Sequence, residues 1–339
     1  MKNILIILLF GSNILCAEQM KLKLEYQKVN DTIDILNIKE KEFSNNKNID
    51  SLGDMNGYMI DFQYPIQNNL TFNIIYNKIN LDYLSETLVN NKFNLKMRYR
   101  YKQLNNYNFF ISVGYEQNKA NKLYITNISA INENIKRVLP SKDISISKDG
   151  SSLSYLNSNG VHSSTNLNIN PYVSIDNTYD KSLYIQSSIL YNNINFLLGY
   201  KQIKIINNLD SSIAHENNIN IQNELNSGSS KASYNDKRED SMIYLKLSYS
   251  FNIYAIKSNI SYQYNKIQRI NCLKETNTNS IINLDFIYDI NNDLSFYIGS
   301  KLMSNQFNGE IPYFYTKYTK TTFDHKYGYA KSGLIFKFN

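Results

Sequence analysis

One segment of the chain carries basic side chains in a pattern that could select charged solutes. Four cations occupy every second position: Lys96, Arg98, Arg100 and Lys102. The positions between them are apolar or aromatic, so a β-strand here would place the four cations on one face. Facing a water-filled passage, they would concentrate anions and favour their permeation. The structural alternative is that they fill the interior by pairing with acids: Glu25, Asp61, Glu116 or Asp285.

The last segment of the chain alternates in the same way. One face would carry Ser332, Leu334, Phe336 and Phe338, and the other Lys331, Gly333, Ile335 and Lys337. A strand that ends a soluble protein would not usually carry so large an apolar face. The pattern is expected where lipid covers one face and water the other.

Between these two segments and before them, alternating stretches of about ten residues follow one another. Short gaps fall near residues 67, 105, 192, 252 and 292, and long polar gaps near 43, 86, 149, 224, 274 and 315. The largest gaps are 117–181 and 207–240. We count twelve strands, or fourteen if 123–131 and 167–175 also cross. A soluble β-sandwich is the alternative, but it offers no reason for short and long gaps to alternate.

These features resemble those of bacterial outer-membrane β-barrel proteins. The resemblance implies an all-β, antiparallel, up-and-down transmembrane barrel with short periplasmic turns and long extracellular loops. It also implies that Leu334, Phe336 and Phe338 form the assembly signal, in which a terminal aromatic is read by the barrel-assembly machinery. In this chain Asn339 follows that aromatic. The expected surroundings are the lipids of the outer membrane of a Gram-negative bacterium.

The N-terminus has the three parts of a secretory signal peptide. Lys2 precedes an apolar run over 4–10, and a short segment ending in Ala17 follows. We expect export through the secretion translocon, cleavage near Ala17, and a single barrel domain over 18–339. Acylation of Cys16 is disfavoured because bulky Leu15 precedes it. After cleavage only Cys272 remains, which excludes an intrachain disulfide.

Composition narrows the function classes. The formal charge of +7 is dispersed along the chain, so it does not predict a nucleic-acid partner. Tyr is abundant, at 29 residues, and aromatic residues favour strands. Beyond the leader no apolar run reaches the 18 residues of a membrane-spanning helix. His162, His215 and His325 lie in three separate loops, and no metal or cofactor motif occurs.

One short run points toward an enzymatic barrel: Ser158-Asn159-Gly160 resembles part of the outer-membrane phospholipase A site. In that family a His stands two residues before the Ser, and an Arg follows the Gly. This chain has Leu156 and Val161 at those positions. We therefore expect no catalytic residue.

The sequence thus predicts a porin-like channel for small hydrophilic solutes, with a preference for anions. One alternative is a surface adhesin or structural barrel whose lumen is plugged and whose loops bind. An outer-membrane lipid hydrolase is the third. The solute and the oligomeric state stay open.

Overall fold

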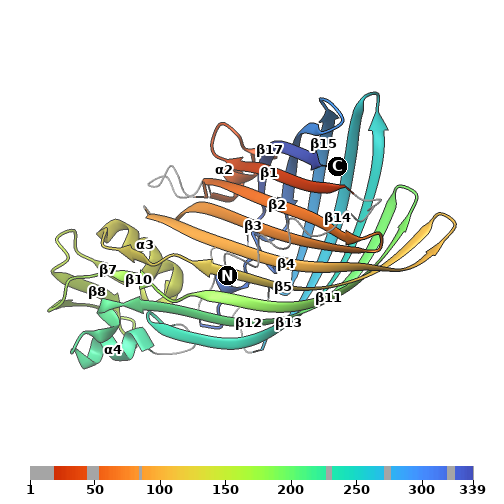
Figure 1. Cartoon of the computed structure of the whole chain (residues 1–339). Coiled ribbons are helices and arrows are strands. Elements are labelled where there is room, and N and C mark those ends of the chain that lie inside the picture. Colours follow the sequence, from red (N-terminus) through yellow and green to blue (C-terminus); the bar gives the residue numbers. More distant parts are fainter. Residues whose placement is uncertain are drawn as a thin grey trace, which may run out of the picture.

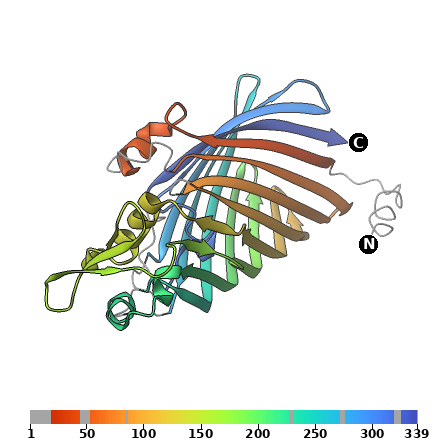
Figure 2. The ribbon, with the colours of Figure 1, turned by 90° about the vertical axis from the view of Figure 1, so that its left-hand side faces the viewer.

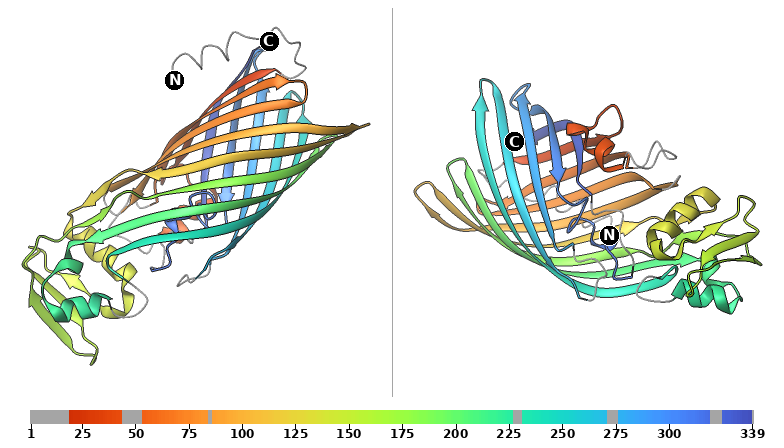
Figure 3. Two further views of the ribbon diagram at one scale, coloured as in Figure 1. Left: turned by 60° about the horizontal axis from the view of Figure 1, so that its bottom comes forward. Right: turned by 180° about the vertical axis from the view of Figure 1, so that it is seen from behind.

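The structure, a computed structural model, describes residues 19–43, 53–83, 86–226, 231–270, 276–318 and 325–338. Twelve long antiparallel strands close into a barrel, as expected (Figures 1 and 3). They are β1 (Met20–Val29), β2 (Met55–Gln67), β3 (Leu70–Tyr83), β4 (Glu86–Leu104), β5 (Tyr107–Ala120), β11 (Tyr179–Tyr191), β12 (Ile194–Ser211), β13 (Tyr234–Ile253), β14 (Ile256–Gln268), β15 (Thr278–Asp289), β16 (Leu294–Met303) and β17 (Tyr327–Phe338).

Closure depends on the pairings of β1 and β11. β1 pairs with β17, which joins the two ends of the chain, and β11 pairs with both β5 and β12. Every barrel strand therefore has a neighbour on each side. Closure removes the unpaired backbone edges that lipid would not tolerate. None of the helices in the described residues is long and apolar enough to cross a bilayer.

The side chains alternate as the sequence predicts. On β11 and β12 the outward positions carry exposed apolar residues such as Leu183, Ile185, Phe196 and Leu198. Inward positions carry buried polar or charged residues, for example Ser182 and Lys201. An apolar outer face with a polar interior is the pattern of a barrel surrounded by lipid.

Short connections gather at one end of the barrel, which we call the turn end. Two-residue turns join β2 to β3, β4 to β5, β11 to β12 and β13 to β14, and a longer one spans 290–293. The turn expected at Asn252 lies two residues later, because pairing continues to Ile253 and Ile256 and Tyr254 adopts a positive φ of 52°. The outer ends of β1 and β17 meet here, with Met20 opposite Phe338.

The opposite end, the loop end, is only partly as expected. The gap expected at 117–181 is a folded region rather than a plain polar loop, and it spans 121–178 because β5 and β11 extend into the predicted gap. It holds β6 (Leu123–Ile125), α3 (Ile128–Val138), η2 (Pro140–Lys142), β7 (Ser145–Ile146), β8 (Ser152–Leu156), β9 (His162–Asn166) and β10 (Val173–Ile175).

Two segments of this region decide between twelve and fourteen strands. β6 and β10 pair with each other, and β10 pairs with the end of β12. Each is three residues long. A strand needs about nine to eleven residues to cross a bilayer, so neither crosses. Of the segments expected at 123–131 and 167–175, residues 123–125 and 173–175 are strand, and they extend the sheet above the barrel.

Two other gaps also differ from the expectation. The stretch 207–240 is partly strand, since β12 runs to Ser211 and β13 begins at Tyr234; between them lie η3 (Ser212–His215) and α4 (Ile219–Asn226). The gap near residue 86 is no long loop: β3 and β4 extend until only 84–85 separate them. The connection after β1 holds η1 (Ile35–Asn37) and α2 (Ile38–Phe43), and that after β16 holds η4 (Pro312–Phe314).

The folded region at the loop end shares a continuous hydrophobic core with the adjoining end of the barrel. Ile131, Ile144 and Leu153 are almost fully buried together with Ile213 and Ile221 from the connection after β12. Residues 121–178 and 212–226 therefore form one unit, which we call the head. It projects beyond one side of the barrel (Figures 1 and 2).

Three tyrosines lie against glycines on the barrel wall. Tyr184, Tyr244 and Tyr297 each face a glycine directly across a strand pair: Gly114, Gly199 and Gly333. A Cβ added to any of these glycines would collide with the facing ring. The hydroxyl groups reach one strand further, with that of Tyr184 donating to Asn94 at 3.0 Å and that of Tyr297 to Glu25 at 2.6 Å. Each ring therefore lies flat on the wall and leaves the lumen wider than an upright ring would.

Candidate functional site: the lumen and its constriction loop

The connection between β16 and β17 folds into the barrel. Within it, Gln306, Phe307, Asn308 and Tyr313 are buried, at 1%, 4%, 0% and 2% exposure. A segment with these aromatic side chains becomes buried because it enters the lumen and packs against the wall. We call residues 304–318 the constriction loop.

Amide side chains from several strands hold the constriction loop. Tyr313 donates from its hydroxyl to Asn90 on β4 at 2.8 Å. Asn118 on β5 donates to the carbonyl of Glu310 at 3.0 Å, and Asn279 on β15 donates to that of Asn308 at 2.9 Å. The loop is thus tied to opposite sides of the wall. These contacts satisfy its backbone groups, which burial would otherwise leave unpaired.

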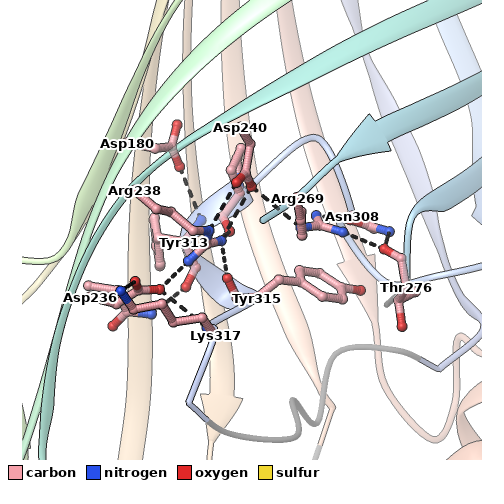
Figure 4. A network of polar contacts seen from close by, with 12 residues as sticks. Asp180, Asp236, Arg238, Asp240, Arg269, Thr276, Asn308, Tyr313, Tyr315 and Lys317 are labelled. Atoms are coloured by element: carbon pink, nitrogen blue, oxygen red, sulfur yellow. Dashed lines mark hydrogen bonds and ion pairs between the residues drawn. The ribbon is translucent and has the colours of Figure 1, made fainter. Parts of the chain in front are cut away.

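Two arginines form the firmest attachment (Figure 4). Arg238 on β13 pairs with Asp236 and, at 3.0 Å, with Asp240, and it donates to the carbonyls of Pro312 and Tyr315. Arg269 donates to the side chain of Asn308 at 2.6 Å and lies over the Tyr315 ring at 4.9 Å. Asp236 and Asp240 are almost completely buried. Their negative charges are therefore stable only while the arginines neutralise them.

Glu310 attaches the constriction loop to β16. Its carboxylate pairs with Lys301 on β16. Burial raises its pKa, but Lys301 and Lys92 favour the charged form and hold the pKa of Glu310 below its usual range. Glu310 is therefore a carboxylate at neutral pH.

Two adjoining cavities lie between the constriction loop and the turn end. Their volumes are about 310 and 210 Å³, and they share Lys92, Asn94, Glu116 and Glu310 in their walls. The charged residues that line them are Lys23, Lys92, Lys96, Lys201, Lys301 and Lys331, with Glu25, Glu116 and Glu310. Lysines therefore outnumber carboxylates around this space.

Three of the four acids expected to neutralise the basic segment have other partners. The fourth, Asp61, accepts a hydrogen bond from Asn73 and attracts Lys96 electrostatically. Glu116 pairs with Lys92 at 3.0 Å and with Lys201 at 2.9 Å. Glu25 pairs with Lys23 at 3.0 Å, and Asp285 with Lys331 at 2.7 Å. The lumen charges thus form a ring drawn from several strands rather than a ladder along one.

The four residues of the predicted ladder have different surroundings. Lys96 lines the smaller cavity. The guanidinium of Arg98 lies 3.6 Å from the centre of the Phe110 ring. Arg100 donates to the carbonyl of Asn68 in the turn after β2, at 2.8 Å. The register shifts between Arg100 and Lys102, so Lys102 stands opposite Phe109 on the outward face. A β-bulge at Tyr101 thus reverses the alternation, and the placement of Lys102 in the lumen was wrong.

The closing strand has the faces that the sequence predicts. Leu334 stands opposite Phe296 and Leu24 on the outer surface, and Phe338 stands opposite Met20. On the lumen side Lys331 pairs with Asp285, and Lys337 with Asp289 at 2.8 Å. The role of Leu334, Phe336 and Phe338 as an assembly signal stays a prediction, and Asn339 lies outside the described residues.

The lipase-like residues lie in the head. Leu156 stands directly opposite His162 in the β8–β9 hairpin, and Ser158 lies in the turn between them. The imidazole of His162 is 3.8 Å from Asp143, and the backbone amide of Ser158 donates to Glu224. Among the described residues no hydrogen bond joins a Ser hydroxyl to a His ring in this hairpin, which Ser–His catalysis requires.

Sequence reasoning missed the constriction loop, although it contains a useful pattern. The run Ile311-Pro312-Tyr313-Phe314-Tyr315 is too apolar for an extracellular loop, and its proline argues against a central strand. It also missed Lys23, Lys92 and Lys331 as a group. They lie on three different strands, so only the closed barrel brings them together.

The sequence matches no protein-family model and no curated protein. The fold is similar to that of solved outer-membrane barrels. For the NanC porin the TM-score is 0.45 with 9% identity, covering 94% of this chain and 100% of that chain. For the translocator domain of the autotransporter NalP from Neisseria meningitidis the values are 0.48 and 8%, covering 95% and 90%.

Outer membrane phospholipase A from Escherichia coli also has a similar fold, with a TM-score of 0.37 and 10% identity, covering 96% of this chain and 93% of that chain. These similarities extend to the barrel architecture. The strand pairings and the apolar outer face of the chain establish that architecture independently. The chain is a closed, twelve-stranded antiparallel barrel with an apolar outer face.

Proposed function

We propose that the chain is an outer-membrane channel for passive diffusion of small hydrophilic solutes, with a preference for anions. The observation that carries this proposal is the pair of cavities lined by lysines beside the constriction loop. The polar, amide-rich wall suits hydrated solutes, and the loop limits their size. Export through a cleaved leader near Ala17 belongs to the same proposal.

The preference for anions follows from the charge balance of the wall. Lys96 and Lys246 both face the lumen and repel each other. Asp61 attracts Lys96 from a neighbouring strand, but within the described part of the chain no carboxylate lies within ion-pair distance of either lysine. An anion entering the cavities would offset their mutual repulsion, whereas a cation would add to it.

Single-channel conductance in a planar bilayer, with the reversal potential measured across a salt gradient, tests this function. We expect an anion-selective reversal potential that shifts toward cation selectivity in the Lys96→Glu/Lys246→Glu variant. The control is Lys136→Glu/Lys148→Glu, which makes the same charge change on the head and should leave the potential unchanged. A folded barrel that never conducts would contradict the channel. Conduction with equal shifts in both variants would contradict the role of the two lumen lysines.

The head favours a second candidate function, a barrel that binds a partner through its extracellular region. Its buried apolar residues, such as Ile131 and Leu153, support a folded surface in this region. Replacing 147–166 by a short Gly-Ser turn would remove most of the β7–β9 sheet. Loss of binding to a cell surface, with unchanged conductance, would support this function; unchanged binding would contradict it. The lipid hydrolase has no such support, given the contacts of Ser158 and His162.

A further inference from the structure

The charges on the outer face of the barrel are unevenly distributed. By register and alternation, seven lysines point outward near the loop end: Lys28, Lys78, Lys119, Lys181, Lys204, Lys237 and Lys266. Near the turn end, Lys102 is the outward lysine that the described strands present. A rim that was simply solvated would not need this asymmetry.

Four of these lysines form a compact group on β5, β11, β12 and β13, which we call the lysine patch: Lys119, Lys181, Lys204 and Lys237. Lys181 stands directly opposite Lys204. Lys204 is 73% exposed and pairs with Glu239 at 3.3 Å, the acid that faces it on β13. The ammonium of Lys181 lies 5.2 Å from the Tyr179 ring.

Like charges placed directly opposite on neighbouring strands are destabilising. Within the described residues one ion pair reaches the lysine patch, the pair of Lys204 with Glu239. An additional anion between Lys181 and Lys204 would turn this repulsion into attraction. The patch therefore has the charge of a surface that meets an anionic partner.

The height of the patch on the barrel identifies that partner. Lys181 is two residues beyond the exposed, apolar Leu183, and Lys204 is four residues beyond Tyr200. At about 3.3 Å per residue these steps are roughly 7 and 13 Å along the strands. The ammonium groups thus lie just above the apolar surface that hydrocarbon covers, at the level of lipid headgroups.

We propose that the lysine patch binds the phosphate groups of anionic lipid headgroups in the leaflet at the loop end. Its side chains point away from the lumen, so the proposal is independent of the channel. Phosphate oxygens accept hydrogen bonds from ammonium groups, and the apolar face below receives the acyl chains. A lipid satisfies both surfaces at once, which a soluble anion cannot do.

Retention of lipid by the folded protein tests the proposal. The barrel is reconstituted in phosphatidylcholine containing phosphatidic acid, extracted in mild detergent, and its bound lipids are counted by native mass spectrometry. We expect Lys181→Gln/Lys204→Gln to weaken retention of phosphatidic acid by about fivefold per lysine, or about 25-fold, while phosphatidylcholine is unaffected. The control Lys102→Gln/Lys148→Gln removes the same charge elsewhere and should retain phosphatidic acid fully.

A charge-conserving variant and a competition with inorganic phosphate separate the proposed lipid site from its alternatives. Lys181→Arg/Lys204→Arg keeps both charges and should retain the lipid, which separates lost charge from a disturbed fold. Equal retention in the Gln variant and its control would overturn the proposal. So would complete displacement of phosphatidic acid by millimolar inorganic phosphate, because the patch would then be a site for a free anion.

Discussion

At the residue scale, Gly199 and Tyr244 show how the wall is kept thin. The two residues face each other across β12 and β13, and a Cβ on Gly199 would meet the Tyr244 ring. The Tyr244 hydroxyl donates to Gln186 on β11 at 3.1 Å, so the ring is held at its far end as well. The ring therefore cannot move aside without losing this hydrogen bond.

We expect Gly199→Ala to destabilise the barrel by about 1–3 kcal/mol, the usual cost of overpacking. In a strand without a facing ring, Ala would be more favourable than Gly. In a Tyr244→Ala background the same change should therefore cost less than about 0.5 kcal/mol. Urea unfolding of the refolded barrel measures both free-energy costs. Far-UV circular dichroism follows the unfolding, since the chain has no Trp for fluorescence. Equal costs in the two backgrounds would show that the ring and the glycine are not coupled.

Lys102 illustrates at the same scale what sequence could not provide. Its position in an alternating run predicts a lumen side chain, and the β-bulge at Tyr101 reverses that. Nothing in the local pattern marks the bulge, because it arises from pairing with β5. The faces of Lys96 and Arg98 lie before the bulge and follow the alternation. Local periodicity is thus reliable up to the first irregularity in pairing.

At the element scale, the constriction loop depends on Arg238. This side chain joins two buried aspartates to two carbonyls of the loop. Removing the cation leaves buried negative charge without its main partner, which costs about 3–5 kcal/mol for a buried ion pair. The strain falls on the loop, because the barrel strands keep their own hydrogen bonds.

We therefore expect Arg238→Met to release the constriction loop while the barrel stays folded. Single-channel conductance should rise, and hydrogen exchange at 304–318 should become faster. Lys136→Met, which breaks an exposed pair with Glu133 on the head, is the matched control; exposed pairs are worth about 0–1 kcal/mol. If exchange at 304–318 stays slow in Arg238→Met, the network does not hold the loop.

The location of the constriction loop inside the lumen could not be predicted from the sequence. Strands were predictable because their alternation is local. In ten of the twelve, the C-terminal end is followed by a connection that the sequence predicts. The destination of 304–318 depends on contacts with Asn90, Asn118 and Asn279, which lie far away in sequence. A composition typical of a surface loop can therefore belong to a segment that enters the lumen.

At the scale of the whole molecule, closure joins the first and last strands. Leu334 and Phe336 cover the seam from the outside, opposite Leu24 and Leu22 on β1. Because their predicted role is recognition during assembly, two effects need to be separated: the stability of the seam and the reading of the signal.

We expect Phe336→Asn/Phe338→Asn to lower the yield of folded barrel in cells by at least severalfold, while the purified variant still refolds into lipid vesicles. Ser332→Asn, on the same face of β17, should change neither. Heat-modifiable migration on gels measures the folded fraction in both settings. Normal yield in cells would contradict the assembly role, and failure in both settings would assign these residues to seam stability alone.

The twelve-strand closure was predictable from sequence, whereas the folded head was not. Closure follows from an even number of alternating segments that place both ends together. The head forms because Ile131 and Leu153 meet Ile213 and Ile221 from a different connection. In the sequence these residues are scattered among Asn, Ser and Lys, so no period reveals their common core.

The barrel wall is also much taller on one side, since β12 and β13 have 18 and 20 residues while β16 and β17 have 10 and 12. A strand needs only about nine to eleven residues to cross the bilayer, so the surplus extends beyond the membrane at the loop end and carries the head. With the loop end outside the cell, as proposed above, antibodies, phages and proteases would meet the head before the pore. Trimming β12 and β13 in steps of two residues would lower it without reversing either face.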